Sequence, residues 1–313
     1  MKDLNIEKWK NFMGAIVGDC VGSRFEFDNI KSKNFDLFTP ESTLTDDSLM
    51  TIAVFKALTN CKEDYSDLAE QTVKCMRELG RLYPEAGYGV KFDFWLHDKN
   101  PKPYNSWGNG SAMRVSGCGF MANTLEEAEK LAEITASVTH NHPEGIKGAK
   151  ATAAAVFLAK NGTDKKEIRE YITKNYYPLD FTLDEIRNDY DFDVSCQGTV
   201  PPALQAFFES ENFEDAIRNA VSIGGDSDTV AAVTGAVAGA YYGVPEDILL
   251  QMLTGKKYVV TMFYEDTAEI SSQIILDKTL LDIIKAFAEK ADCYQPKIYN
   301  SVVVSDDEEK KDE

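Results

Sequence analysis

Apolar residues recur at spacings of three and four along most of the chain, and this pattern predicts a succession of helices. It runs through residues 7–22, 46–59, 65–79, 124–138, 144–160, 199–209, 213–221, 228–242 and 274–290. No long run alternates apolar and polar residues as a half-buried strand would, and no strand–helix–strand succession is visible. Residues 257–264 match a strand only locally. The pattern therefore favours an all-α fold.

Two of the predicted helices carry glycine at every fourth position. These are Gly14, Gly18 and Gly22 in the first, and Gly235, Gly239 and Gly243 in the second. Each interior glycine costs a helix about 1 kcal/mol relative to alanine, so the repeat needs a compensating gain. Close backbone packing between two central helices supplies one.

Two long connections interrupt the helices, at about residues 81–110 and 177–198, and both are rich in Tyr, Pro, Asn, Gly and Asp. Long connections in a compact domain are often functional, and we expect the first to shape a pocket. The acidic residues 305–313 have no apolar face to bury, which predicts a disordered tail. We therefore expect residues 1–304 to form a single domain.

Composition and charge favour a globular cytoplasmic protein over a membrane-spanning, disulfide-bonded or nucleic-acid-binding one. Hydrophobic residues make up 43% of the 313, enough for a sizeable core. No apolar stretch reaches the roughly 18 residues of a membrane span, and the N-terminus does not look like a signal peptide, so we expect a cytoplasmic protein. Six cysteines without a C-x-x-C pair indicate reduced thiols. A formal charge of −19 argues against a nucleic-acid partner.

Two acidic clusters stand immediately before predicted helices. Thr45-Asp46-Asp47-Ser48 precedes residues 49–58, and Asp226-Ser227-Asp228-Thr229 precedes residues 230–242. The simplest interpretation is helix capping, because Asp, Ser and Thr accept hydrogen bonds from free N–H groups there. A cap uses one side chain, however, and each cluster offers two carboxylates and a hydroxyl group. The additional oxygen atoms suggest a further ligand.

If the two helix N-termini face each other, four carboxylates converge and repel one another unless a cation neutralises them. Hard, oxygen-preferring ions such as Mg²⁺ or Mn²⁺ suit these ligands. The segment 189–193 resembles the start of a calcium loop, but Val194 stands where the turn glycine belongs. Zinc is poorly supported, because the chain has three histidines and no cysteine pair.

Several motifs in one order resemble the ADP-ribosylglycohydrolase family, from about residue 11 to about residue 245. They are Gly14-Ala15-Ile16-Val17-Gly18-Asp19 with Gly22-Ser23-Arg24-Phe25-Glu26, Thr45-Asp46-Asp47-Ser48, Gly87-Tyr88-Gly89, Trp107-Gly108-Asn109-Gly110-Ser111-Ala112-Met113-Arg114, Thr139-His140 and Gly224-Gly225-Asp226-Ser227-Asp228-Thr229. The resemblance implies a compact orthogonal helical bundle with a central dinuclear metal cleft.

The resemblance also implies the metal ligands and the catalytic groups. The ligands of two Mg²⁺ or Mn²⁺ ions would be Thr45, Asp46, Asp47, Asp226, Asp228 and Thr229, and the catalytic residues would be Glu26 and Asp47. Two metal ions can hold the ribose hydroxyls and activate water. Glu26 would transfer a proton at that water or at the leaving group. From the sequence alone, a single glutamate in a loop would be a surface residue.

For the substrate, the resemblance implies binding residues in and just after the first long connection, together with a histidine further along the chain. These residues would be Gly87, Tyr88, Gly89, Ser106, Trp107, Gly108, Asn109, Gly110, Ser111, Met113 and His140. The loop 106–109 would hold the diphosphate with N–H donors, Trp107 would stack on adenine, and His140 would lie near the diphosphate. The simpler alternatives are a chain reversal at the Gly-Asn-Gly turn and a tryptophan packed on the core.

These expectations describe a hydrolase that removes ADP-ribose from a modified target. The partner would be an ADP-ribosylated protein or an ADP-ribose-containing small molecule. We favour an arginine linkage, because the stretch 109–114 and the compact length look bacterial. The alternatives are an inactive ADP-ribose-binding or structural member of the same fold, and a two-metal phosphoesterase, which the small number of histidines argues against.

Overall fold

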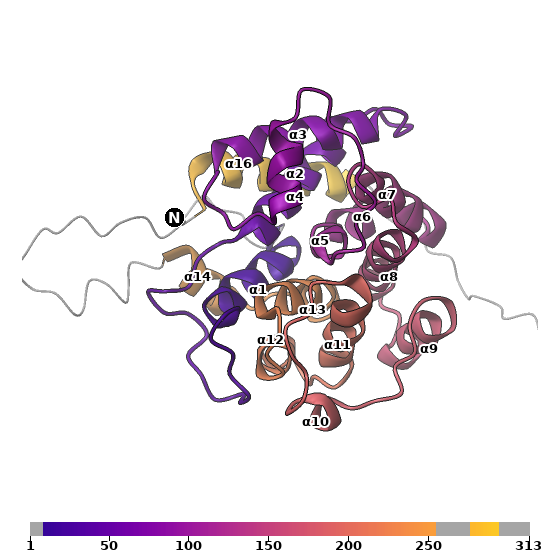
Figure 1. Cartoon of the computed structure of the whole chain (residues 1–313). Helices are drawn as coiled ribbons and strands as arrows, with labels where there is room; N and C mark the ends of the chain where they lie inside the picture. Colours follow the sequence, from indigo (N-terminus) through magenta and orange to yellow (C-terminus); the bar gives the residue numbers. More distant parts are fainter. Residues whose placement is uncertain (1–8, 255–275, 294–313) are drawn as a thin grey trace, which may run out of the picture.

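The computed structural model describes residues 9–254 and 276–293, and regular secondary structure within them is helical (Figure 1). One isolated antiparallel bridge joins Gly108 to Ser195. The all-α prediction is therefore confirmed for the described part of the chain. The strand-like segment 257–264 and the acidic segment 305–313 lie outside the described residues. Among residues 9–254 and 276–293, no helix has both the length and the apolar character needed to cross a membrane.

The helices follow the predicted order, with several additions. In chain order they are η2 (Lys10–Met13), α1 (Gly14–Gly22), η3 (Ser23–Phe25), α2 (Asp46–Asn60), α3 (Leu68–Leu82), α4 (Val90–His97), α5 (Gly110–Met113), α6 (Ser116–Met121), α7 (Leu125–Ser137), α8 (Pro143–Lys160), α9 (Lys165–Asn175), α10 (Leu183–Ile186), α11 (Cys196–Phe208), α12 (Phe213–Ser222), α13 (Ser227–Tyr242), α14 (Glu246–Thr254) and α16 (Lys278–Cys293).

Helix α13 lies at the centre of the molecule, and every residue from Ser227 to Gly239 is buried. Its closest neighbour is α1, and the glycines of the two helices bring the backbones into contact. A Cβ atom at Gly14 would lie 2.1 Å from the carbonyl oxygen of Gly235, and one at Gly18 would lie 2.0 Å from that of Ala231. The predicted glycine packing is correct for this pair of helices.

Gly243 was predicted to belong to the glycine repeat, but it does not. It follows the last residue of α13 with a φ of +77°, a left-handed conformation that an L side chain rarely adopts. Its N–H bonds to the carbonyl oxygen of Gly239 at 3.1 Å. This glycine therefore ends the helix instead of packing it against α1.

Helix α11 contains two prolines that lack the N–H of the helical ladder. Because Pro202 cannot donate, the carbonyl oxygen of Gly198 is available to another donor. The hydroxyl group of Tyr190 occupies it at 3.1 Å. The connection that precedes α11 is thus bound to the helix that follows it, and this connection forms part of the site described below.

Candidate active site

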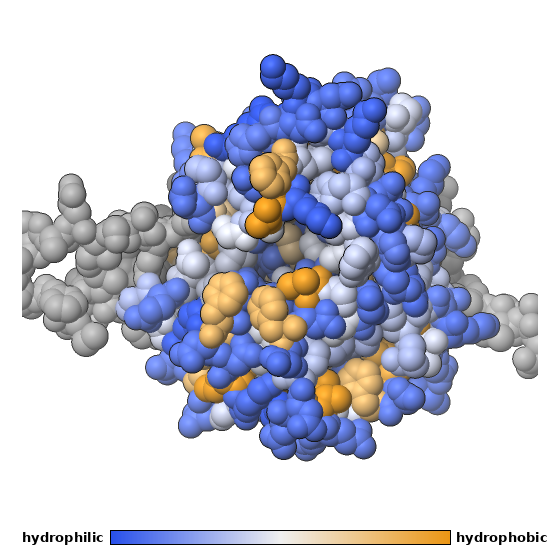
Figure 2. All heavy atoms as spheres, viewed as in Figure 1, coloured by the Kyte–Doolittle hydropathy of each residue, from blue (hydrophilic) through white to orange (hydrophobic). Residues whose placement is uncertain are grey.

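The N-termini of α2 and α13 open into one cavity of about 410 Å³. Figure 2 shows the corresponding hollow, with apolar side chains at its edge. The two acidic clusters therefore face a common space, which the residues alone had left open and the family resemblance had implied. The lining residues are Glu26, Asp46, Asp47, Met50, Gly87, Gly89, Val90, Lys91, Phe92, Tyr104, Ser106, Gly108, Asn109, Gly110, Met113, Arg114, His140, Phe192, Val194, Asp226, Asp228 and Thr229.

The start of α2 is held by a buried aspartate of α1. The carboxylate of Asp19 accepts hydrogen bonds from the backbone N–H of Thr45 at 3.0 Å and of Ser48 at 3.1 Å, and it also accepts from both hydroxyl groups. Thr45 in turn caps the helix by accepting from the N–H of Asp47. Asp19 and Thr45 therefore accept hydrogen bonds from the N–H groups at the start of α2. The carboxylates of Asp46 and Asp47 are not needed for capping and line the cavity instead.

One of these carboxylates has an oxygen atom without a partner. Oδ2 of Asp47 is buried and accepts no hydrogen bond from the protein. At the other helix, Asp226 occupies the N-cap position of α13 without a side-chain capping bond. Its Oδ2 instead accepts from the amide of Asn109 at 2.7 Å. Capping alone accounts for neither side chain, and a buried oxygen without a donor is costly unless a cation binds it.

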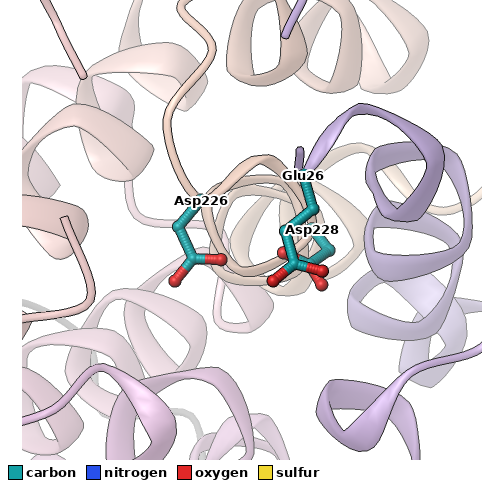
Figure 3. A group of neighbouring side chains, drawn as sticks. All are labelled: Glu26, Asp226 and Asp228. Atoms are coloured by element: carbon teal, nitrogen blue, oxygen red, sulfur yellow. The ribbon is translucent and has the colours of Figure 1, made fainter. Parts of the chain in front are cut away.

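A third acidic side chain joins the second cluster. Glu26 follows η3, and its carboxylate lies with those of Asp226 and Asp228 so that one oxygen of each falls within 4.8 Å of the others (Figure 3). Asn29 holds this segment against the start of α13: its amide oxygen accepts from the N–H of Gly225 at 2.7 Å, and its amide nitrogen donates to the same residue's carbonyl oxygen at 2.9 Å. Three carboxylates can thus serve one cation.

Burial and mutual repulsion make these groups hard to ionise. Burial raises the pKa of Asp19 to about 6, although hydrogen bonds from Ser48 and Thr45 oppose the rise. Burial, with the charges of Asp226 and Asp19, raises the pKa of Glu26 to about 7. The pKa values of Asp47 and Asp228 also lie well above the usual range, because both are buried and both face other carboxylates. A bound divalent cation would relieve this penalty.

The opposite wall of the cavity contains a buried cation. Arg114 is 1% exposed and donates to the carbonyl oxygen of Gly110 at 2.7 Å and to the hydroxyl of Thr139 at 2.8 Å. The same hydroxyl lies 2.7 Å from Nδ1 of His140. Burial, followed by the charge of Arg114, holds the pKa of His140 well below its ordinary value. This wall therefore presents a neutral imidazole over a buried guanidinium.

Four of the expected site residues do not line the cavity. Thr45 is buried beneath it as the cap of α2, and Ser111 donates to the carbonyl oxygen of Gly145 at 2.7 Å. The ring of Tyr88 packs against Phe92, with 5.6 Å between centroids. Trp107 lies on the surface beside His142. The remaining expected residues all line it.

A family model described as ADP-ribosylglycohydrolase matches residues 11–279 of this sequence. The chain belongs to the ADP-ribosylglycohydrolase family. Members of this family hydrolyse ADP-ribose linkages, and the predicted resemblance is confirmed. The match includes both acidic clusters, Glu26 and the wall formed by residues 104–114.

Individual relatives agree with the family match. ADP-ribosylhydrolase ARH3 of Homo sapiens is 28% identical, over 74% of this chain and 84% of that protein. ADP-ribosylarginine hydrolase Tri1 of Pseudomonas putida (strain GB-1) is 30% identical, over 74% of this chain and 69% of that protein. One solved structure, described as an ADP-ribosylglycohydrolase-related protein complex, matches with a TM-score of 0.60 at 21% sequence identity. The match covers 94% of this chain and 100% of that chain, and it supports the fold.

Three residues of the site, Asp19, Asn29 and Arg114, had no role predicted from the sequence. Asp19 could have been found, because it is a single carboxylate inside an apolar helical segment of the family motif, and such a group needs partners when buried. Arg114 ends another family motif, but nothing in the pattern shows that its guanidinium is buried. No feature of the sequence indicates a role for Asn29, because its partner Gly225 is 196 positions away.

The raised pKa values predict how the metal-free protein responds to pH. A carboxyl group with a higher pKa in the folded state stabilises the fold at low pH, and this stabilisation is lost as pH rises through the folded pKa. The window runs from about 4, the unfolded value, to about 7 for Glu26. In EDTA we expect the Tm to fall by roughly 5 °C between pH 5 and pH 8.

Adding Mg²⁺ or Mn²⁺ should reverse this fall, and more strongly at pH 8 than at pH 5, because protons compete with the metal for the same carboxylates. Saturation at about one hundred times Kd corresponds to about 2.7 kcal/mol. Thermal unfolding followed by differential scanning fluorimetry measures both effects. A Tm in EDTA that is constant from pH 5 to pH 8 would contradict the clustering of carboxylates.

Proposed function

We propose that this protein hydrolyses the bond between ADP-ribose and an arginine side chain, with two divalent ions, Mg²⁺ or Mn²⁺, in the acidic cavity. The main observation behind the proposal is that the buried carboxylates of α2 and α13 converge with the partly buried carboxylate of Glu26, and that one Asp47 oxygen has no hydrogen-bond donor. The arginine linkage is supported by the similarity to a relative named as an ADP-ribosylarginine hydrolase.

The residues present fit a pair of hard cations. Carboxylate and hydroxyl oxygens are the ligands that such ions prefer, and the candidate donors that line the cavity are Asp46, Asp47, Asp226, Asp228 and Thr229, with Glu26 beside them. Thr45, which the family resemblance also implied, does not line the cavity, and its hydroxyl group is engaged with Asp19 and with the N–H of Asp47. When bound, the ions would neutralise the carboxylates, orient the ribose hydroxyls and make a water molecule more acidic. Asp19 does not join them, because both of its oxygens already accept hydrogen bonds.

Glu26 is our candidate for the proton transfer that hydrolysis requires. Its carboxylate lies beside those of Asp226 and Asp228 at the cavity. The hydrogen bond between Asn29 and Gly225 fixes the segment that carries Glu26 against the start of α13. We assign it the proton that passes between the attacking water and the leaving group. Glu26→Gln should lower kcat by about a hundredfold or more while the affinity for ADP-ribose is retained. Unchanged kcat would refute this role.

The diphosphate would lie along the loop 106–110, which lines the cavity together with His140 and Arg114. The Thr139 hydroxyl accepts from Arg114, so its own hydrogen is available to Nδ1 of His140. This arrangement places the imidazole proton on Nε2, next to Gly108 and Gly110. His140 would then donate to a phosphate oxygen while remaining neutral, and the buried guanidinium would add long-range attraction.

His140→Ala should therefore weaken binding more than it slows chemistry. Loss of one hydrogen bond to a charged oxygen corresponds to about 1.5–3 kcal/mol, or about a tenfold to hundredfold rise in the Kd for ADP-ribose. Isothermal titration calorimetry with free ADP-ribose measures it. His97→Ala is the matched control, because His97 is exposed at the end of α4 and does not line the cavity. An unchanged Kd would contradict the assignment.

A panel of linkages tests the proposed function. Purified protein with Mg²⁺ or Mn²⁺ is incubated with arginine-linked, serine-linked and nucleobase-linked ADP-ribosyl substrates, and free ADP-ribose is measured by chromatography. The proposal predicts release from the arginine-linked substrate. Release from another linkage alone would leave the glycohydrolase activity standing and correct the acceptor. No release from any, with ADP-ribose still bound, would indicate a non-catalytic binder.

A further inference from the structure

Two phenylalanine rings stack on each other at the mouth of the cavity and remain open to solvent. The centroids of Phe27 and Phe192 are 6.0 Å apart, and the ring planes differ by 27°. Phe27 is 85% exposed and Phe192 is 46% exposed. Phe192 lines the cavity together with Val194, and Phe27 directly follows Glu26. Large aromatic side chains gathered in the open at the edge of a cavity are typical of a ligand-binding surface.

The segments that carry the two rings are tied together. The ammonium group of Lys31 donates to the carbonyl oxygen of Tyr190 at 2.6 Å and to that of Ile223 at 2.5 Å. Tyr190 is itself bound through its hydroxyl to Gly198 in α11. The backbone around both rings is therefore held in place before a ligand arrives. Such preorganisation reduces the entropy lost on binding.

The charges around the rings favour a cation. Asp28 follows Phe27 and Asp191 precedes Phe192, and both aspartates are exposed. Lys31 is engaged with two carbonyl oxygens and does not compete for this surface, and Lys91 is a second positive charge that lines the cavity. Exposed aromatic faces attract cations, and a guanidinium group is planar enough to stack on them. A neutral serine side chain would gain much less from this surface.

We propose that Phe27 and Phe192 form the subsite for the acceptor side chain and select a guanidinium group. The inference rests on the proposed function, since it assigns the leaving-group side of that reaction. The rings adjoin Glu26 and the acidic cluster, where the bond to ribose breaks. In the proposed binding mode, adenine would lie at the other end of the substrate, beyond the diphosphate on the loop 106–110. The pair therefore determines which linkage enters the site, and the scissile bond is positioned next to Glu26.

The test separates acceptor binding from ADP-ribose binding. Phe27→Ala and Phe192→Ala should each raise the KM for an arginine-linked ADP-ribosyl peptide about tenfold, as expected for a lost cation–aromatic contact. The Kd of free ADP-ribose should stay within about twofold, since that ligand lacks the acceptor. Phe192→Leu keeps apolar surface but has no aromatic face, and it should show most of the loss. Phe94→Ala is the matched control, because Phe94 is 72% exposed and does not line the cavity.

The outcomes are distinguishable. A weaker Kd for free ADP-ribose in the Phe27 and Phe192 variants would mean that the rings hold adenine, which overturns the inference. An unchanged KM for the arginine-linked peptide would also overturn it, as would full rescue by leucine. If the wild-type protein hydrolyses only the serine-linked peptide, the inference fails while glycohydrolase activity stands. If it hydrolyses neither peptide, the proposed function itself fails.

Discussion

Replacing Asp228 with asparagine is expected to lower turnover by about a thousandfold or more, because the loss of a metal-binding carboxylate removes several kcal/mol of transition-state stabilisation. Asp228 is 4% exposed and faces Asp47, Asp226 and Glu26. The asparagine keeps an oxygen that can accept from the N–H of Thr229, the bond that Asp228 accepts at 2.9 Å. The helix should therefore remain intact while the affinity for metal falls.

Three measurements separate this effect from unfolding. Circular dichroism should show unchanged helicity, and calorimetry should show weaker binding of Mn²⁺. In EDTA the variant should unfold at the same temperature as the wild type or higher, because one repelling charge is gone. Asp164→Asn is the control, since Asp164 caps α9 outside the cavity. Activity near that of the wild type in Asp228→Asn would show that this carboxylate holds no metal.

Gly18→Ala is expected to have the largest effect on folding among simple substitutions in the central helices. The added Cβ atom would lie 2.0 Å from the carbonyl oxygen of Ala231 and 2.5 Å from its carbon. Both contacts are with backbone, so no side chain can rotate to relieve them. We expect destabilisation by about 3 kcal/mol or more, equivalent to roughly 6–12 °C in Tm.

Activity should fall in the same variant, because Asp19 and Glu26 follow Gly18 in the chain and α1 must approach α13 for both acidic clusters to meet. Gly80→Ala is the matched control in another helix: its Cβ atom would meet only the methyl and methine groups of Leu96, a flexible side chain. A smaller decrease in Tm is expected there. Equal decreases for the two variants would contradict the role of backbone contact between α1 and α13.

Much of the fold could be predicted from the sequence, because its central helices have a regular spacing of apolar residues and glycines. The glycine repeat of α1 and the apolar pattern of α13 predicted two central helices in contact, and the acidic clusters predicted their N-termini. Helix α9 was missed, because only Ile168 and Ile172 of its residues are fully buried. Helix α4 was read as part of a long connection, because apolar residues occupy both its sides: Val90 and Phe94 are exposed, whereas Phe92, Trp95 and Leu96 are buried.

The site was predictable to the extent that its residues cluster in the sequence. Asp46, Asp47, Asp226 and Asp228 stand in short motifs, so their chemistry could be inferred before their geometry. The position of Glu26 depends on Asn29 and Gly225, a contact between distant segments that no local pattern encodes. The aromatic pair likewise unites Phe27 with Phe192, and only the folded chain brings these two segments together.

The most direct test of the central claim is the release of ADP-ribose by protein from which divalent ions have been stripped with EDTA and then restored. Free ADP-ribose is measured from an arginine-ADP-ribosylated protein, with Asp228→Asn in parallel. We expect no release in EDTA, recovery on adding Mg²⁺ or Mn²⁺ in excess, and no recovery in the variant. Equal release with and without EDTA would contradict a metal-dependent hydrolase at this acidic cavity.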